Sequence, residues 1–437
     1  MSDQLVKLRP PKAVLEITRD LEKAGFQAWC VGGAVRDALL GHQHLDWDLA
    51  TDATPDQVRT VFGRKRTIPV GIDFGTVGIL DADGVMHEVT TFRRDVRTDG
   101  RHAEVEFGAS LDEDLARRDF TVNAIAYSST KAELHDPFGG RRDLEARLIR
   151  AVGTPADRMR EDRLRALRAI RFAARFDFTI DPQTWEAMRG SAPHLTRLSA
   201  ERVKQEIEKT MDQVAAPSRA LKLWRESGAV DVLVPELSRA SDESLRAVDF
   251  AAQPGLARRP GRRLARLAIL FSDIPAESAL HLATRLRFSK HEAQWISAIV
   301  GRWQALGPEM STASSEGVPS AAQIRRWIAT IGRPQLAAFF RLADARWAAR
   351  RTAKLSAPTA QAVHSLYRKS LRAALTEPVD LRDLAVDGDD LRQAGITPGP
   401  GLGKILSSLL DLVIEDPRTN TRERLLTEAR RLHSKLS

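Results

Sequence analysis

The chain has a single cysteine, Cys30, among its 437 residues. One thiol excludes an internal disulfide and a cysteine-rich zinc site. The sequence also lacks any run of roughly 18 apolar residues, which a membrane-spanning helix would require, and its first residues lack the apolar core of a signal peptide. We therefore expect a protein that acts in the cytoplasm and has no membrane partner.

Aromatic residues are scarce, at 6%, whereas basic residues are abundant. The chain carries 67 lysine and arginine residues against 58 aspartate and glutamate residues, which gives a net charge of +9. Guanidinium groups match the geometry of phosphate oxygens, and nucleic acids release counterions when a basic protein binds them. The composition favours a polyanionic partner, although a basic bias without such a partner would look the same.

The length predicts two or more domains, and the pattern of apolar residues changes near residue 152. Before it, helices and strands alternate; after it, helical periodicity dominates. We predict three parts, at residues 1–152, 153–255 and 256–437. Gly307–Ser320 is rich in Ser, Gly and Pro and is expected to be a mobile loop or a boundary. The expected strands are Gln27–Val31, Leu45–Ala50, Gly75–Leu80 and Val85–Thr91; the expected helices near them are residues 11–25, Ala34–Leu40 and one that begins at Thr54.

Two glycines and two carboxylates form the most informative pattern in the chain. Gly32 and Gly33 follow a predicted strand and would let a backbone turn approach phosphates closely. Asp46 and Asp48 alternate with Leu45, Trp47 and Leu49, so that in a strand both carboxylates would project from one face. Two such oxygen donors repel each other unless a cation lies between them, and they suit Mg²⁺. A lone Asp-x-Asp pattern or a lone glycine pair would be weak evidence.

The combined pattern at Gly32–Thr51 resembles the signature of the class II tRNA nucleotidyltransferases, which comprise the CCA-adding enzymes and bacterial poly(A) polymerases. The resemblance implies an α+β fold, in which a DNA polymerase β-like head with a mixed sheet is followed by an all-α neck, body and tail. It also implies two Mg²⁺ ions held by Asp46 and Asp48. Glu88 is either a third catalytic carboxylate or a surface residue.

Further blocks extend this resemblance to about residue 210. The block Arg117–Ala124 matches a family motif whose arginines can clamp a triphosphate. We accordingly expect Gly32, Gly33, Arg36 and Arg118 to contact the nucleotide. A polar loop that takes part in adding the terminal adenosine is expected around Arg93, Arg94, Asp95 and Arg101.

The block Glu161–Arg165 is similar to the family's nucleotide-selecting motif. We predict a helix over Asp162–Phe176, on which Asp162, Arg165 and Arg168 share one slowly rotating face. Through the resemblance, a carboxylate acceptor and a guanidinium donor would read the Watson–Crick edge of cytosine or adenine, and Arg168 and Arg171 would help to hold the nucleotide. A surface ion pair with little energetic weight is the alternative.

The resemblance implies template-independent addition of CMP, CMP and AMP to the 3′ end of tRNA, with CTP and ATP as substrates and pyrophosphate as the product. The main alternative is a poly(A) polymerase with the same head. Residues Ile68–Val77 resemble a stretch of the CCA-adding enzymes, whereas Gly63–Arg66 only partly matches the basic run of the polymerases. An enzyme that adds only CC, or an RNA-binding protein without activity, fits the motifs less well.

Overall fold

The computed structural model describes residues 8–42, 46–98, 103–251, 261–397 and 399–436. The chain forms two compact units. The first comprises residues 1–214 and 219–235, and the second comprises residues 215–218 and 236–437. Within the described residues all strands belong to the first unit, and no helix is long and apolar enough to cross a membrane.

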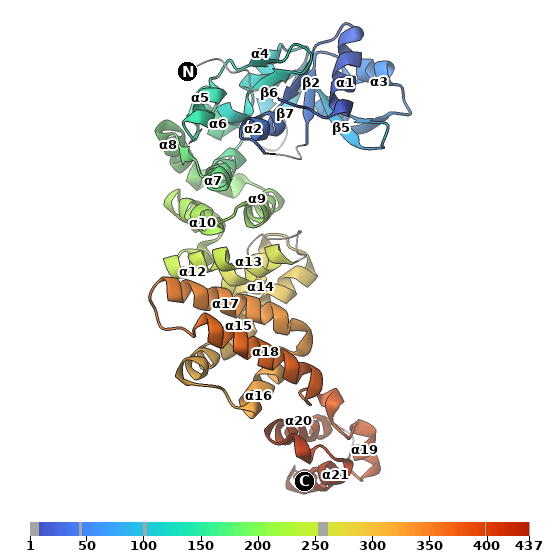
Figure 1. Cartoon of the computed structure of the whole chain (residues 1–437), viewed down its shortest axis with the longest axis vertical. Coiled ribbons are helices and arrows are strands. Elements are labelled where there is room, and N and C mark those ends of the chain that lie inside the picture. The colour runs from blue at the N-terminus through green and yellow to red at the C-terminus, as the bar shows by residue number, and fades with distance from the viewer. Residues whose placement is uncertain (1–7, 43–45, 99–102, 252–260, 398, 437) are drawn as a thin grey trace. The chain divides into compact units, whose positions relative to one another are not determined.

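A seven-stranded mixed sheet is the centre of the first unit, with the strand order β3-β4-β5-β2-β1-β8-β9. Figure 1 labels two of its strands, β2 and β5. Only β2 and β5 pair in parallel; the other neighbours are antiparallel. The strands predicted around residues 27–31, 45–50, 75–80 and 85–91 are confirmed with small shifts. The seven strands are β1 (Ala28–Val31), β2 (Asp48–Thr51), β3 (Thr67–Gly71), β4 (Thr76–Leu80), β5 (Met86–Thr91), β8 (Ala126–Ser128) and β9 (Glu133–His135).

Helices pack against this sheet through apolar faces. In the first helix Val14, Ile17 and Leu21 are buried, at the helical spacing seen in the sequence. The third helix begins at the predicted cap. Thr54 and Gln57, in the first turn, form a capping box in which each side chain accepts the backbone N–H of the other residue. The helices up to residue 233 are α1 (Lys12–Lys23), α2 (Gly33–Leu39), α3 (Pro55–Phe62), α4 (Leu111–Ala116), α5 (Gly140–Glu145), α6 (Pro155–Glu161), α7 (Leu164–Phe176), α8 (Pro182–Ser191), α9 (Ala200–Gln213), α10 (Pro217–Glu226) and α11 (Ala229–Leu233).

The segment predicted as a polar loop around residues 93–101 is a hairpin in its described part. Strands β6 (Arg93–Thr98) and β7 (Ala103–Phe107) pair antiparallel and form a sheet of their own. The prediction missed them because both strands are rich in charged residues, which hide the usual alternation of apolar and polar side chains. Another short parallel pair joins β10 (Leu148–Ile149) to β11 (Thr179–Ile180).

The second unit is helical in its described residues. The mobile loop predicted at residues 307–320 is wrong for most of its length, because α15 continues through Pro308 to Glu316. Leu306 and Met310 are buried with Trp327 and Phe339, so packing outweighs the low helix propensity of glycine and proline. The helices are α12 (Asp242–Ala247), α13 (Arg262–Leu270), α14 (Ala276–Arg285), α15 (Lys290–Glu316), α16 (Ala321–Ile331), α17 (Leu336–Thr352), α18 (Ala360–Thr376), α19 (Gly388–Gln393), α20 (Pro400–Glu415) and α21 (Arg422–Leu436).

Candidate active site

A glycine turn between β1 and α2 forms one wall of the candidate site. Gly32 has a φ of +75°, and a Cβ atom there would lie 2.9 Å from Nη1 of Arg118 and 3.9 Å from Oδ2 of Asp48. A Cβ atom at Gly33 would lie 3.5 Å from Nη2 of Arg36. Gly32 is thus required both by the backbone conformation and by the limited space. These distances also place Gly32, Asp48 and Arg118 beside one another.

The two predicted carboxylates lie at the start of β2. The strand begins at Asp48, so Asp46 precedes it instead of lying within it. The predicted alternation holds for the described residues: Trp47 and Leu49 are buried, whereas Asp46 and Asp48 are exposed. Leu45, the remaining apolar residue of the pattern, lies outside the described residues. Both carboxylates are therefore accessible to a ligand.

Glu88 lies on the strand next to Asp48. The parallel register aligns Leu49 of β2 with Val89 of β5, so Asp48 and Glu88 precede an aligned pair and lie on the same face of the sheet. Burial raises the pKa of Asp48 to about 6, and the negative charges of Asp46 and Glu88 add to this effect, whereas Arg118 opposes it. Asp48 keeps access to solvent while the surrounding protein reduces its hydration.

Arg118 is held beside the carboxylates by Asp114. Nη2 of Arg118 donates to Oδ2 of Asp114 at 3.1 Å, and Nη2 of Arg117 donates to Oδ1 of the same carboxylate at 2.8 Å. Nε of Arg118 is buried and has no hydrogen-bond partner among the described residues. A buried donor without a partner costs free energy. The guanidinium group that carries this donor lies beside the glycine turn, where an anion could contact it.

Arg36 lies in the interior behind the glycine turn. It is 4% exposed, its Nε donates to Oδ1 of Asp37 at 2.6 Å, and its Nη1 donates to Oδ1 of Asn123 at 2.5 Å. Its guanidinium also lies 5.0 Å from the ring centre of Phe172 and 4.6 Å from that of Phe176. These contacts attach α2 to α7, so direct contact with a nucleotide would require Arg36 to exchange a partner.

The predicted base-reading pair is arranged differently from the prediction. Helix α7 begins at Leu164, so Asp162 lies in the break between α6 and α7 and does not share a helix face with Arg165. The helix starts late because the Asp162 side chain accepts a hydrogen bond from the backbone N–H of Leu164, at 3.0 Å. Arg165 is buried and donates to Oε2 of Glu161 at 2.7 Å.

The two later arginines of α7 pair with carboxylates of other elements. Arg168 donates to Oδ2 of Asp119 at 2.8 Å, and Arg171 donates to Oε2 of Glu206 at 2.7 Å. Asp119 and Glu206 are both buried. Sequence reasoning missed these two acceptors. Glu206 lies on the buried face of α9, where a helical period can signal burial, whereas Asp119 lies in the turn after α4 and no periodic pattern marks it.

The predicted loop residues lie on or near the β6–β7 hairpin. Arg93 donates to the backbone oxygen of Phe74. Nε of Arg94 donates to Oε2 of Glu106 at 3.0 Å across the hairpin. Asp95 pairs with Val105 through the strand register, and Arg101 lies outside the described residues.

The donor set at the head of β2 fits a hard divalent cation. Its carboxylate oxygens are exposed, and the pKa of Asp48 is raised. Carboxylate oxygens are the ligands that Mg²⁺ prefers. No group of three or more His, Cys, Asp or Glu side chains among the described residues is arranged as a metal cage. Mg²⁺ needs only one or two carboxylates when water and phosphate oxygens complete its shell.

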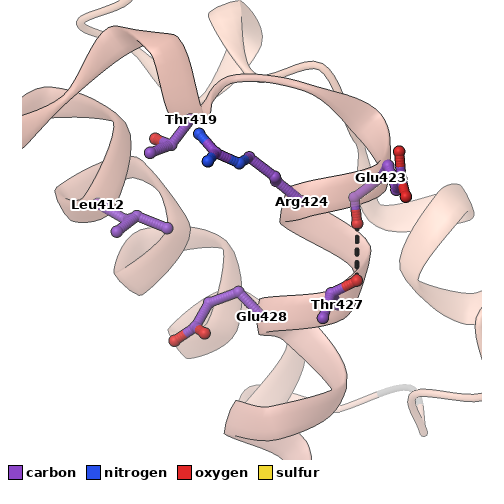
Figure 2. A pocket seen from close by; sticks show the side chains of 6 residues that line it. All are labelled: Leu412, Thr419, Glu423, Arg424, Thr427 and Glu428. Carbon is purple, nitrogen blue, oxygen red and sulfur yellow. Dashed lines mark hydrogen bonds between the residues drawn. The ribbon is translucent and has the colours of Figure 1, made fainter.

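A separate pocket lies in the C-terminal part of the chain, between α20 and α21. Figure 2 shows its lining, in which Thr427 donates to the backbone oxygen of Glu423 at 2.9 Å. One guanidinium and two carboxylates line it together with less polar groups, so its charge does not favour a phosphate. The lining residues are Leu412, Thr419, Glu423, Arg424, Thr427 and Glu428.

Comparison with known protein families identifies the class of the head. Residues 28–150 match the family described as the Poly A polymerase head domain, and residues 177–241 match a probable RNA and SrmB-binding site of polymerase A. The first match covers the glycine turn, the carboxylates and Arg118. The mixed sheet followed by helices therefore has the predicted α+β fold of a nucleotidyltransferase head with a helical extension.

Relatives of nearly the same length show to which family of nucleotidyltransferases the chain belongs. A CCA-adding enzyme of Streptococcus mutans is 32% identical over 95% of this chain and 96% of its own, and one of Levilactobacillus brevis is 34% identical over 94% and 95%. The crystal structure of the Bacillus stearothermophilus CCA-adding enzyme in complex with CTP is 31% identical, with a TM-score of 0.75, and covers 98% of this chain and 100% of its own. The chain belongs to the family of CCA-adding enzymes, which are nucleotidyltransferases. Nucleotidyltransferases of this kind generally use divalent metal ions.

Proposed function

We propose that this protein adds CMP, CMP and AMP to the 3′ end of tRNA, using CTP and ATP and releasing pyrophosphate, without a nucleic acid template. The observation that carries the proposal is the juxtaposition at the head of β2. Asp48 lies beside Glu88 on one face of the sheet, and Gly32 brings the backbone within reach of Asp48 and Arg118. Because the chain belongs to the family of CCA-adding enzymes, we interpret this arrangement as a nucleotidyltransferase site.

Asp46 and Asp48 would hold two Mg²⁺ ions, with Glu88 as the third carboxylate at the edge of the site. Bound there, the ions would lower the pKa of the 3′-hydroxyl group and neutralise the triphosphate. The carboxylates themselves orient the reacting groups on one face of the sheet. Burial raises the pKa of Asp48, and the negative charges of Asp46 and Glu88 add to this effect; a cation bound there would offset these charges.

The glycine turn and Arg118 would hold the triphosphate. Without side chains at Gly32 and Gly33, the guanidinium groups of Arg118 and Arg36 lie close to the backbone of the turn, and a phosphate would offer the buried Nε of Arg118 an acceptor. The predicted nucleotide contacts of Arg36, Arg165, Arg168 and Arg171 stay predictions. Each of these guanidinium groups already contacts protein acceptors, and this favours a role in supporting the site wall.

Base selection would rest on Asp162, with Arg165 as the predicted donor. A carboxylate accepts a hydrogen bond from the amino group of cytosine or adenine but meets an oxygen acceptor in uracil or guanine. A site built to form a hydrogen bond rejects a ligand that cannot form it. The predicted loop of Arg93, Arg94, Asp95 and Arg101, whose described part is the β6–β7 hairpin, would support the addition of A.

The helical parts would bind tRNA, with the head at residues 1–152, a neck at 153–255 and a body and tail at 256–437. The net charge of +9 supports this assignment, since phosphate contacts dominate the affinity of proteins for nucleic acids. We also propose that the protein acts in the cytoplasm. Its single cysteine, Cys30, is buried and free.

The test compares the wild type with Asp46→Asn and Asp48→Asn on a tRNA that lacks CCA, with CTP, ATP and MgCl₂. Extension should fall by about 1,000-fold or more in both variants, because each loses transition-state stabilisation worth several kcal/mol, whereas tRNA affinity should not change. Asp83→Asn, at the β4–β5 turn, is the matched control and should extend normally. Normal extension by either site variant would overturn the assignment.

A further inference from the structure

Asp162 is held at both of its carboxylate oxygens. Oδ1 accepts the backbone N–H of Leu164 at 3.0 Å, and Oδ2 accepts Nη2 of Arg202 at 2.7 Å. Because Asp162 lies in the break between α6 and α7, the helical backbone does not orient its side chain by itself. The two contacts therefore define the direction in which the carboxylate points.

The cationic partner of Asp162 is Arg202 and not Arg165. Nη1 of Arg165 contacts Glu161 and the backbone oxygen of Arg158, and its Nη2 contacts the backbone oxygen of Arg117. Arg202 comes from the first turn of α9, so the ion pair joins two segments that lie 40 residues apart.

The pair between Asp162 and Arg202 stays accessible. The side chain of Asp162 is 25% exposed and that of Arg202 is 30% exposed. A carboxylate has about four lone-pair directions, and the two contacts use two of them. The remaining directions are free to accept a hydrogen bond from a ligand, with an orientation set in advance by Arg202.

We propose that Arg202 is a positioning residue for base selection, which sets the orientation of the Asp162 carboxylate that reads the amino group of cytosine or adenine. This inference rests on the proposed function. It assigns a specificity role to a residue of α9. A fixed acceptor discriminates better than a mobile one, because it cannot turn away from the oxygen of a wrong base.

The experiment measures kcat and KM for CTP, ATP, UTP and GTP with Arg202→Ala and Arg202→Lys on a tRNA lacking CCA. In Arg202→Ala, kcat/KM for CTP relative to UTP should fall about tenfold, the weight of one hydrogen bond to a charged group. Arg202→Lys should restore part of the selectivity, because an ammonium group can still contact one carboxylate oxygen.

Ser199→Ala is the matched control. The Ser199 hydroxyl accepts the backbone N–H of Arg202 at 3.4 Å and caps the same helix, so its removal destabilises α9 and leaves the Asp162 contact in place. Thermal unfolding of all variants compares the stability losses. If Ser199→Ala loses selectivity as much as Arg202→Ala at a similar loss of stability, the role of Arg202 is structural and the inference is overturned.

Asp162→Ala separates this inference from the proposed function. If Asp162→Ala loses selectivity and Arg202→Ala keeps it, only the role of Arg202 is refuted. If Asp162→Ala keeps full selectivity for CTP and ATP, base reading by Asp162 fails and the inference fails with it. If both lose selectivity and the double variant loses no more than Asp162→Ala alone, the two residues act as a unit, as proposed.

Discussion

Replacing Asp48 by asparagine should stabilise the metal-free protein at neutral pH while it abolishes catalysis. In the folded protein the pKa of Asp48 is raised to about 6 by burial and by the charges of Asp46 and Glu88, whereas in the unfolded chain it returns to about 3.9. A raised carboxyl pKa means that folding disfavours the charged form. The asparagine side chain carries no charge, so the variant avoids this cost.

The sign and the pH window follow from the two pKa values. Below about pH 4 Asp48 is protonated in both states and costs nothing; as the pH rises from about 4 to about 6 the folded protein loses stability, and above about pH 7 the loss is complete. A shift of about two pKa units corresponds to about 3 kcal/mol. Because Asp48 is exposed, solvent screening reduces the expected stability cost of its charge to about 1 kcal/mol.

The assay is urea unfolding in EDTA at pH values between 4 and 8, with Asp83→Asn as the control for loss of a surface carboxylate. The difference in free energy of unfolding between Asp48→Asn and the wild type should grow between pH 4 and pH 7 and then level off. Added MgCl₂ should stabilise the wild type above pH 6 and have less effect on the variant. A difference independent of pH, or a variant destabilised at pH 8, would refute the electrostatic reasoning.

Three further predictions concern the head and the charge of the chain. Gly32→Ala should raise KM for CTP and ATP, because the new Cβ atom would lie only 2.9 Å from Nη1 of Arg118 and the backbone conformation disfavours a side chain. An unchanged KM in steady-state assays would refute this. Glu206→Gln should cost about 3 kcal/mol in urea unfolding, because Arg171 stays buried without its counter-charge; a loss below about 1 kcal/mol would contradict the weight given to this pair. The affinity for tRNA should fall linearly on a log–log plot against salt, by a slope of about −0.7 to −0.9 per phosphate contact; a flat response in a filter-binding titration would exclude phosphate-dominated binding.

The regular part of the head could be predicted from the sequence because local signals and tertiary packing agree there. Trp47 and Leu49 are buried and Asp48 is exposed as the alternation predicted, and the cap at Thr54 begins the predicted helix. The family motifs then indicated which polar residues to examine. The proximity of Gly32 and Arg118 comes from the sheet topology, which local pattern does not contain.

Other features depend on long-range contacts that no local pattern reveals. The helix through Pro308 forms because Met310 is buried in the core of the second unit. Asp162 leaves the predicted helix because its side chain accepts the backbone N–H of Leu164, and its partner Arg202 lies 40 residues away. The helical period correctly predicted the spacing of the arginines of α7 but could not identify which carboxylates they would meet.

The most direct test of the central claim is the sequence of the product made from a tRNA without CCA in the presence of all four NTPs and MgCl₂. We expect the wild-type protein to add C, C and A in that order and then stop, and not to extend an unstructured RNA of the same length. Long tracts of A on either RNA would identify a poly(A) polymerase, and addition of CC alone would show that the hairpin does not support adenosine addition. Either result would show that the protein is not a CCA-adding enzyme.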